Sequence, residues 1–206
     1  IAILLTLNTG LRLGELCALQ YKDIDLQNGV IHVTKTVQRI RSGDRTRLAV
    51  LPPKSNSAHR TIPLPLDMAI LLKKAVQSHP DGEKYLLTGK NVPMEPRTLQ
   101  YQYQVLLKAT GIPYRNFHVL RHTYASRCVE RGVDVKSLSE MLGHSDVRTT
   151  LQVYVHSSLE HKMRVIQSIC FLAPVLDPDC SPSPSPSDHP EAPRYQQLLT
   201  TLSQMG

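Results

Sequence analysis

A histidine and an arginine stand three positions apart in the string FHVLRH, which runs from residue 117 to residue 122. If a helix opens here, His118 and Arg121 point to the same face, and the helix N-terminus also favours anions. The pair could therefore hold a phosphate and accept a proton. A solvated basic turn is the ordinary interpretation of an isolated pair of this kind. A metal site built on His118 and His122 lacks the acid of the HExxH motif and an evident third ligand, so we expect no metal.

Four other segments carry residues that suit the same phosphate chemistry. In chain order they are TGLRLGEL at residues 9–16, PK at residues 53–54 followed by RTIPL at residues 60–64, LGH at residues 142–144, and Tyr154. Each has an ordinary interpretation when it is taken alone. Arg12 and Glu15 could form a helical salt bridge, and Tyr154 could be a half-buried helical tyrosine. Taken together they form an ordered set with defined spacing, in which His144 stands 23 residues after Arg121 and ten residues before Tyr154.

The ordered set of segments resembles the tyrosine recombinases, the phage integrase family. The similarity runs from about residue 1 to residue 169, which is essentially the catalytic domain of that family. It implies the α+β fold of that domain, mainly α-helical with a small antiparallel three-stranded sheet. It also implies an enzyme that transesterifies DNA strands, with double-stranded DNA as its partner and no cofactor.

The resemblance implies a role for each residue that matches the family's motifs, and the chemistry of the side chains agrees. Attack on a phosphodiester adds negative charge to the non-bridging oxygens, which two guanidinium groups, here Arg12 and Arg121, can grip. A tyrosine phenol, with a pKa of about 10, must lose its proton as it attacks. Tyr154 as nucleophile therefore needs a base, and His118 can serve as one. His144 would donate a hydrogen bond to the phosphate.

A lysine and a glutamate complete the implied site. The departing 5′-oxygen is a poor leaving group unless it is protonated, and a lysine on a mobile turn can supply the proton. Lys54 resembles the family's hairpin lysine, because the string RTIPL follows it as the family pattern does. Lys35, in the string TKT, is the alternative. Glu15, three residues after Arg12, would orient the basic groups without contacting the phosphate.

The hydrophobic patterns predict two short helices, then a small sheet, then a series of helices. The first helices are predicted at Ile1–Leu7 and Gly14–Leu19, with a break near Thr9 and Gly10. Three alternating, β-branched segments predict the antiparallel strands, at Val30–Val37, Arg47–Leu51 and Arg60–Leu64. The later predicted helices are Met68–Val76, Pro96–Ala109, Val119–Arg131, Val135–Leu142, Val147–Val155 and Leu159–Ile169.

Positive charge is concentrated in the predicted sheet and its loops. The chain has 24 Lys and Arg against 17 Asp and Glu, and its formal net charge of +7 favours a polyanionic partner such as nucleic acid. Residues 35–60 hold seven basic residues and one acid. We expect contacts to the DNA backbone from four of these basic residues, Lys35, Arg39, Arg41 and Arg60. The helix that begins near Pro96 is expected to follow the phosphates as well.

The composition changes after residue 170. Residues 171–206 contain seven of the 15 prolines, the run SPSPSPS, and four acidic residues against one arginine. We expect an extended, disordered tail there and the catalytic domain at residues 1–170. The chain opens inside an apolar helical pattern, so we expect a piece of a longer protein. The resemblance implies a DNA-clamping domain before the catalytic domain, and we expect this piece to lack it.

The overall composition indicates in which cellular compartment the protein is expected to act. With 41% hydrophobic and 20% charged residues, the chain can bury a core. The four cysteines form no C-x-x-C pair, and no apolar run reaches the roughly 20 residues of a membrane span. We therefore expect a cytoplasmic protein without membrane association.

The resemblance implies a site-specific recombinase that cuts and rejoins DNA through a 3′-phosphotyrosyl intermediate, to integrate or excise a mobile element. The full-length protein would act as a homotetramer on two duplexes. Two alternatives stay open at this point: an idle DNA-binding remnant of an integrase, and a type IB-like topoisomerase.

Overall fold

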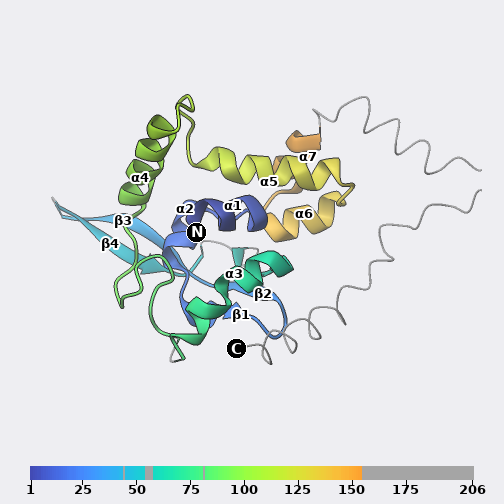
Figure 1. Cartoon of the computed structure of the whole chain (residues 1–206). Helices are drawn as coiled ribbons and strands as arrows, with labels where there is room; N and C mark the ends of the chain where they lie inside the picture. The colour runs from blue at the N-terminus through green and yellow to red at the C-terminus, as the bar shows by residue number, and fades with distance from the viewer. Residues whose placement is uncertain (44, 54–57, 81, 155–206) are drawn as a thin grey trace, which may run out of the picture. The chain divides into compact units, whose positions relative to one another are not determined.

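The computed structural model describes residues 1–43, 45–53, 58–80 and 82–154. The side chains of Ser42, Val153 and Tyr154 also lie outside the described part. The predicted helix Leu159–Ile169 and the predicted tail at residues 171–206 fall outside these ranges. Within them the elements follow the predicted order, with two short helices, then strands, then a series of helices (Figure 1).

Two short helices, α1 (Ala2–Thr9) and α2 (Leu13–Ala18), open the chain as predicted. α1 ends at Gly10, whose φ of 65° lies in the left-handed region that glycine adopts without a steric cost. Gly14 is required for another reason: a Cβ at this position would lie 2.5 Å from Thr36 Oγ1. Because glycine has no Cβ, the start of α2 can approach the neighbouring strand closely.

The strands form two antiparallel sheets. β1 (Ile24–Asp25), β2 (Val30–Val33) and β5 (Arg60–Pro63) make a three-stranded sheet in the order β1-β2-β5. β3 (Thr36–Ser42) pairs with β4 (Arg45–Leu51) to make a separate two-stranded ribbon, which we call the β3–β4 ribbon. The predicted class is therefore confirmed, as a mainly helical α+β fold with a small antiparallel three-stranded sheet.

The division into strands differs from the prediction. One continuous strand over Val30–Val37 is wrong, because the chain leaves the first sheet at Thr34 and Lys35 before β3 begins. Lys35 bonds back to Gln20 and Asp23, next to the short 3-10 helix η1 (Tyr21–Asp23). β3 then packs against α2 instead of continuing the first sheet. Alternation along a strand cannot reveal such a change of partner, because the side-chain pattern is the same in both sheets.

The later helices lie close to their predicted bounds. α4 (Pro96–Ala109) and α6 (Val135–Leu142) have the predicted bounds, and α5 (His118–Glu130) begins one residue earlier. α3 (Leu66–Gln77) is slightly longer than predicted, and α7 (Val147–Tyr154) is described as far as Tyr154. None of the described helices is long and apolar enough to cross a lipid bilayer.

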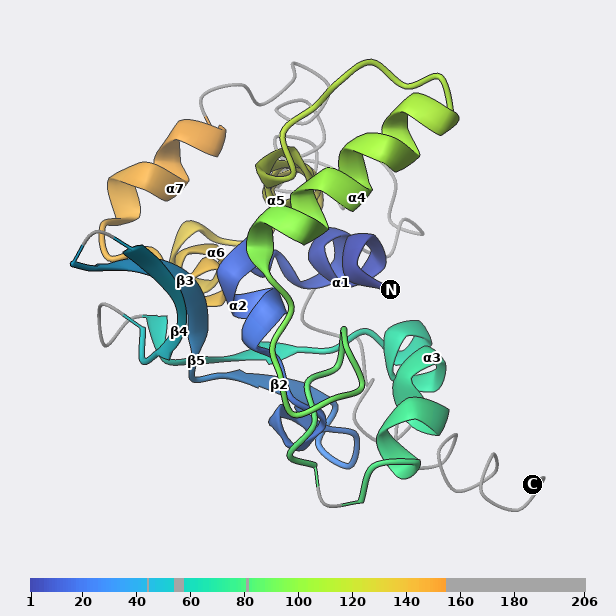
Figure 2. The ribbon, with the colours of Figure 1, turned by 90° about the vertical axis from the view of Figure 1, so that its left-hand side faces the viewer.

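Helix α6 has clear start and stop signals. The Asp134 carboxylate accepts a hydrogen bond from the Ser137 N–H at 2.9 Å, and Gly143, with φ 64°, ends the helix. Its apolar side packs against α5 in a buried cluster of Ala125, Val129, Leu138 and Leu142. Figure 2 shows α2, α6, α7 and the β3–β4 ribbon gathered on one side of the described unit. The ends of these elements, together with the first turn of α5, form the pocket described below.

Gly10→Ala is expected to lower the free energy of unfolding by about 3 kcal/mol. The new Cβ would force a side chain into the left-handed region and would lie 2.6 Å from Tyr124 Cδ1. Gly111→Ala is the matched control, because Gly111 has a similar φ of 68° but no atom within 4 Å of the added Cβ. The control should lose only the backbone contribution, about 1 kcal/mol. Urea unfolding measures both variants, and equal losses would show that Tyr124 does not constrain Gly10.

Candidate active site

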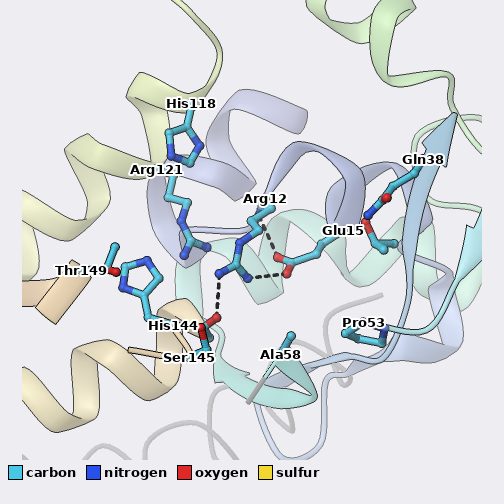
Figure 3. A pocket seen from close by; sticks show the side chains of 12 residues that line it. Arg12, Glu15, Gln38, Pro53, Ala58, His118, Arg121, His144, Ser145 and Thr149 are labelled. Atoms are coloured by element: carbon cyan, nitrogen blue, oxygen red, sulfur yellow. Dashed lines mark hydrogen bonds and ion pairs between the residues drawn. The ribbon is translucent and has the colours of Figure 1, made fainter. Parts of the chain in front are cut away.

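A pocket of about 430 Å³ lies between the ends of several elements (Figure 3). Arg12 comes from the start of α2, His118 and Arg121 from the first turn of α5, and His144 from the turn between α6 and α7. All four line the pocket, together with Glu15. Figure 3 shows Arg12, Arg121 and His144 pointing toward the same space. Four of the six residues predicted to be catalytic are therefore brought together from distant parts of the chain.

The last turn of α6 holds three arginines in place. The carbonyl groups at a helix C-terminus lack partners inside the helix and form the negative end of its dipole. Three consecutive carbonyls here, which we call the α6 carbonyl end, each accept a hydrogen bond from a different arginine. The pairs are Met141 O with Arg60 Nε (2.7 Å), Leu142 O with Arg121 Nη2 (2.7 Å) and Gly143 O with Arg12 Nη2 (2.6 Å). One helix end thus positions guanidinium groups from three other elements.

Glu15 is buried between two of these arginines. Its carboxylate accepts two hydrogen bonds from Arg60, at 2.9 and 2.8 Å, and one from Arg12 Nη1 at 2.8 Å. Burial raises the pKa of Glu15, but the hydrogen bonds and charges of Arg60 and Arg12 outweigh burial and lower the pKa to about 2. Glu15 is therefore ionised at neutral pH and binds both arginines, which is the geometry that its predicted orienting role requires.

Arg60 is buried in the structure, whereas the sequence predicts that it contacts DNA from the surface. Its side chain is only 5% exposed. Nε donates to the Met141 carbonyl, and both terminal nitrogens donate to Glu15. Arg60 therefore links β5 to α2 and to the α6 carbonyl end from inside the protein. Sequence reasoning counted it as one more surface base, because the burial of this side chain cannot be seen in a string of charges.

Arg121 is also buried, with 3% of its surface exposed. Nη1 donates to the Gly10 carbonyl and Nη2 to the Leu142 carbonyl, both at 2.7 Å. Burial, and then the charge of Arg12, lowers the pKa of Arg121 to about 9, so the guanidinium is still charged at neutral pH. A cation fixed in this way needs little reorganisation when an anion enters the pocket.

Both histidines of the pocket are neutral at pH 7. Burial, and then the charges of Arg121 and Arg12, lower the pKa of His144 to about 4. Burial, and then the neighbouring His122 and Arg121 side chains, lower the pKa of His118. The rings of His118 and His122 meet edge-on, with centroids 4.7 Å apart. A neutral imidazole has one donor and one acceptor nitrogen, so each ring can either accept a proton or donate a hydrogen bond.

The model of one family, described as the phage integrase family, matches residues 1–161. The chain belongs to the phage integrase family. Curated members include a tyrosine recombinase XerC-like protein of Caldanaerobacter subterraneus subsp. tengcongensis, 31% identical over 185 residues, which cover 81% of this chain and 47% of the relative. The tyrosine recombinase XerA of Saccharolobus solfataricus is 34% identical over 158 residues, which cover 77% and 45% of the two chains. This integrase-family chain thus spans about half the length of these relatives.

Solved structures agree with this assignment of the fold. The Tn1549 transposon integrase, in complex with a circular intermediate DNA, superposes with a TM-score of 0.67 at 25% identity, over 82% of this chain and 58% of that one. XerA recombinase superposes with a TM-score of 0.56 at 27% identity, over 81% and 56% of the two chains. The family match at residues 1–161 includes the whole of the unit Ile1–Tyr154.

Two residues that match integrase motifs fall at the edge of the described structure. Lys54 belongs to residues 54–57, which lie outside the described part, and Tyr154 is described only as the last residue of α7. Pro53 and Ala58, on either side of residues 54–57, both line the pocket. Lys35, the alternative to Lys54, forms an ion pair with Asp23 at 3.3 Å and does not appear among the described residues that line the pocket.

The remaining predicted DNA contacts, Arg39 and Arg41, lie on the β3–β4 ribbon. Arg39 donates to both carboxylate oxygens of Glu95, at 3.2 and 3.0 Å, and so ties the ribbon to the residue that precedes α4. Arg41 is exposed and donates to the Gly43 carbonyl at 3.2 Å. Both are placed on the surface, although Arg39 already has an anionic partner.

Sequence reasoning missed Thr150, which is fully buried and lies with its hydroxyl oxygen 2.8 Å from His144 Nδ1. The only available signal was its place in the string TTLQVY, four residues before Tyr154, which any helical threonine could share. In the described part of the chain, no group of three or more His, Cys, Asp or Glu is arranged to hold a metal ion.

Glu15→Gln is expected to lower the free energy of unfolding at pH 7 by about 3 kcal/mol, because it leaves the buried Arg60 charge without its anion. Glu83→Gln is the matched control, since Glu83 forms an ion pair with Lys22 at 2.7 Å in which both side chains are largely exposed. The control should leave stability nearly unchanged, because an exposed ion pair contributes little. Equal effects of the two substitutions in urea unfolding would contradict a buried role for Glu15.

The same ion pair predicts how stability depends on pH. The pKa of Glu15 is lowered from 4.5 to about 2, so its contribution is complete above pH 4.5 and is lost as the pH falls toward 2. The shift corresponds to about 3 kcal/mol. The gap in unfolding free energy between wild type and Glu15→Gln should therefore narrow from pH 7 to pH 3. A constant gap would mean that the charge of Glu15 is not what stabilises the site.

Proposed function

We propose that this chain carries the catalytic domain of a site-specific tyrosine recombinase, which cuts and rejoins double-stranded DNA through a 3′-phosphotyrosyl intermediate. The observation that carries the proposal is the pocket shared by Arg12, His118, Arg121 and His144, which lies beside the helix that ends at Tyr154. We assign the domain to residues 1–170. The described unit Ile1–Tyr154 supports most of this range.

Arg12 and Arg121 would hold the non-bridging oxygens of the scissile phosphate. Each guanidinium has more N–H groups than its described bonds to carbonyl and carboxylate oxygens use. Arg121 is rigidly held, whereas the Arg12 side chain is 35% exposed and reaches the pocket from the start of α2. Two preorganised cations can stabilise the charge that develops on the phosphate, so the reaction itself calls for no metal or nucleotide.

The proton transfers would be divided between the two sides of the phosphate. Neutral His118 would accept the proton of the Tyr154 phenol as its oxygen attacks phosphorus and the bond to the 5′-oxygen breaks. Lys54 would give a proton to the departing 5′-oxygen. We prefer Lys54 to Lys35 because Lys35 is already bonded to Asp23 and Gln20. The free 5′-hydroxyl of a second strand would then attack the phosphotyrosine and restore the phosphodiester.

The DNA duplex would lie across the β3–β4 ribbon and α4. The ribbon carries exposed Arg39, Arg41, Arg45 and Arg47, which could follow the phosphate backbone. The complex of the Tn1549 integrase with a circular intermediate DNA supports this partner. We further propose a homotetramer on two duplexes and a role in integrating or excising a mobile element. The free thiols Cys17 and Cys128 suit the reducing cytoplasm as the place of action.

A nicked suicide substrate tests the proposal. The probe is a pool of labelled duplexes, randomised around a phosphate that lies just beside a nick, so that the short 5′-hydroxyl strand is lost after cleavage. The expected product is a protein–DNA adduct that resists detergent and is destroyed by protease, and sequencing the trapped DNA identifies the site. DNA binding without any adduct would instead identify an idle remnant. Relaxation of plasmids of arbitrary sequence would identify a topoisomerase.

A further inference from the structure

The hydroxyl of Thr150 is bonded in an unusual way for a helical threonine. Such a hydroxyl ordinarily donates to the main-chain carbonyl four residues earlier. Four other threonines within or at the end of helices in this chain follow that rule. They are Thr6 to Ala2, Thr9 to Leu5, Thr110 to Leu106 and Thr123 to Val119.

Thr150 departs from the rule. Its hydroxyl lies 2.8 Å from His144 Nδ1, and within the described residues it makes no hydrogen bond to the carbonyl of Asp146, one turn earlier. The side chain is fully buried, so solvent water cannot serve as an alternative hydrogen-bond partner for the hydroxyl. A buried hydroxyl that leaves its usual acceptor for an imidazole nitrogen is placed to act on that imidazole.

The protonation of His144 makes this contact informative. Burial and the neighbouring charges of Arg121, Arg12 and Arg60 lower its pKa to about 4, so the ring is neutral at pH 7. A neutral ring has a single N–H, which is carried either by Nε2 or by Nδ1. A hydroxyl can donate or accept, whereas the oxygens of a phosphate diester only accept. A phosphate in the pocket can therefore be bound only by the tautomer whose N–H points into it.

We propose that Thr150 is a positioning residue that donates its hydroxyl hydrogen to Nδ1 and so places the single N–H of His144 on Nε2, facing the pocket. The ligand, a DNA phosphate, rests on the proposed function. A carbonyl or carboxylate in place of the hydroxyl would fix the opposite tautomer and direct a lone pair at the phosphate. The hydroxyl is the partner that allows a neutral histidine to act as a donor among three arginines.

The contact also joins two parts of the site. Thr150 and Tyr154 are four residues apart in α7, which is about one helical turn. The main-chain N–H of His144 donates a hydrogen bond to the Ser139 carbonyl, in the last turn of α6, at 3.1 Å. This bond attaches His144 to α6. Movement of α7 away from α6 would break the hydroxyl contact. Whether His144 can donate a hydrogen bond to the phosphate therefore depends on the position of α7, the helix that contains Tyr154.

The tautomer of His144 can be measured directly on the full 206-residue chain. Two-bond 1H–15N correlation spectra of 15N-histidine-labelled protein at pH 7 distinguish the two tautomers, and His144→Gln identifies the signals by their loss. We expect the Nε2–H form in wild type and in Thr150→Ser, and a mixture of both forms in Thr150→Val. Thr6→Val is the matched control, because it removes an equally buried hydroxyl from α1 and should leave the His144 signals unchanged.

The rate of adduct formation provides a second readout. With saturating nicked DNA, Thr150→Val should react about tenfold more slowly than wild type, while Thr150→Ser should stay within about threefold. DNA affinity should be the same in all three proteins, because the substitution changes which nitrogen donates and not the charge of the pocket. Thr6→Val should react at the wild-type rate.

The outcomes separate this inference from the proposed function. An Nδ1–H tautomer in wild type, or an unchanged tautomer in Thr150→Val, overturns the inference even if the adduct forms. If the wild type forms no adduct but shows the expected tautomers, the proposed function is overturned and the role of Thr150 is not. The wild-type and Thr150→Ser spectra decide the question even if Thr150→Val fails to fold.

Discussion

Tyr154→Phe is expected to abolish the covalent protein–DNA adduct, with a fall in rate of at least about 10⁴-fold. Phenylalanine keeps the ring at the end of α7 but has no phenolic oxygen to form the bond to phosphorus. The arginines and histidines of the pocket are untouched, so the phosphate should still bind. Single-turnover trapping on the nicked DNA pool measures the rate.

Tyr85→Phe is the control for this loss. It also removes one phenolic oxygen, but Tyr85 pairs with Gln20 in an isolated bridge and is not among the described residues that line the pocket. It should form the adduct at the wild-type rate. Both variants should bind labelled DNA with the same affinity and the same dependence on salt. An adduct formed by Tyr154→Phe would place the nucleophile elsewhere in the chain.

Arg121→Lys is expected to slow adduct formation about 1,000-fold while the protein still folds. The guanidinium donates to the Gly10 and Leu142 carbonyls from two different nitrogens, each at 2.7 Å. A lysine ammonium is a single point of charge and cannot span both carbonyls while also presenting two N–H groups to a phosphate. The positive charge is kept, so the loss reports on geometry.

A stability measurement accompanies this rate. One carbonyl left unpaired in the interior should lower the free energy of unfolding by about 2 kcal/mol, and assays well below the unfolding temperature keep the variant folded. Arg127→Lys, at an exposed position of the same helix, should leave both rate and stability unchanged. A rate for Arg121→Lys within tenfold of wild type would mean that charge alone, and not the two-carbonyl grip, serves the reaction.

Helices were the part of the fold that could be predicted best from the sequence. α6 has an Asp cap, an apolar face and a terminal glycine, and its predicted bounds are those of the structure. The strands were harder, because a change of sheet at Thr34 and Lys35 leaves no trace in the alternation of side chains. Local patterns report what a segment can form, and the choice of partner is made by the rest of the chain.

The candidate site divides in the same way. Arg12, His118, Arg121 and His144 could be predicted because each belongs to a motif whose order and spacing identify a family, and the pocket contains all four. The groups that hold them could not. Main-chain carbonyls have no sequence signature, and Arg60 and Thr150 owe their roles to burial that only the folded chain produces.

The hydrogen bonds at the α6 carbonyl end also indicate which elements of the domain can change in sequence and which cannot. The outer ribbon, residues 39–47, and helix α4 contribute none of the three arginines held there. In the proposed function these elements contact the DNA, so we expect that their side chains can be exchanged for a new target site while the chemistry is left intact. Retargeting libraries should therefore be confined to these surfaces. A shift of α6, in contrast, would disturb all three guanidinium groups at once.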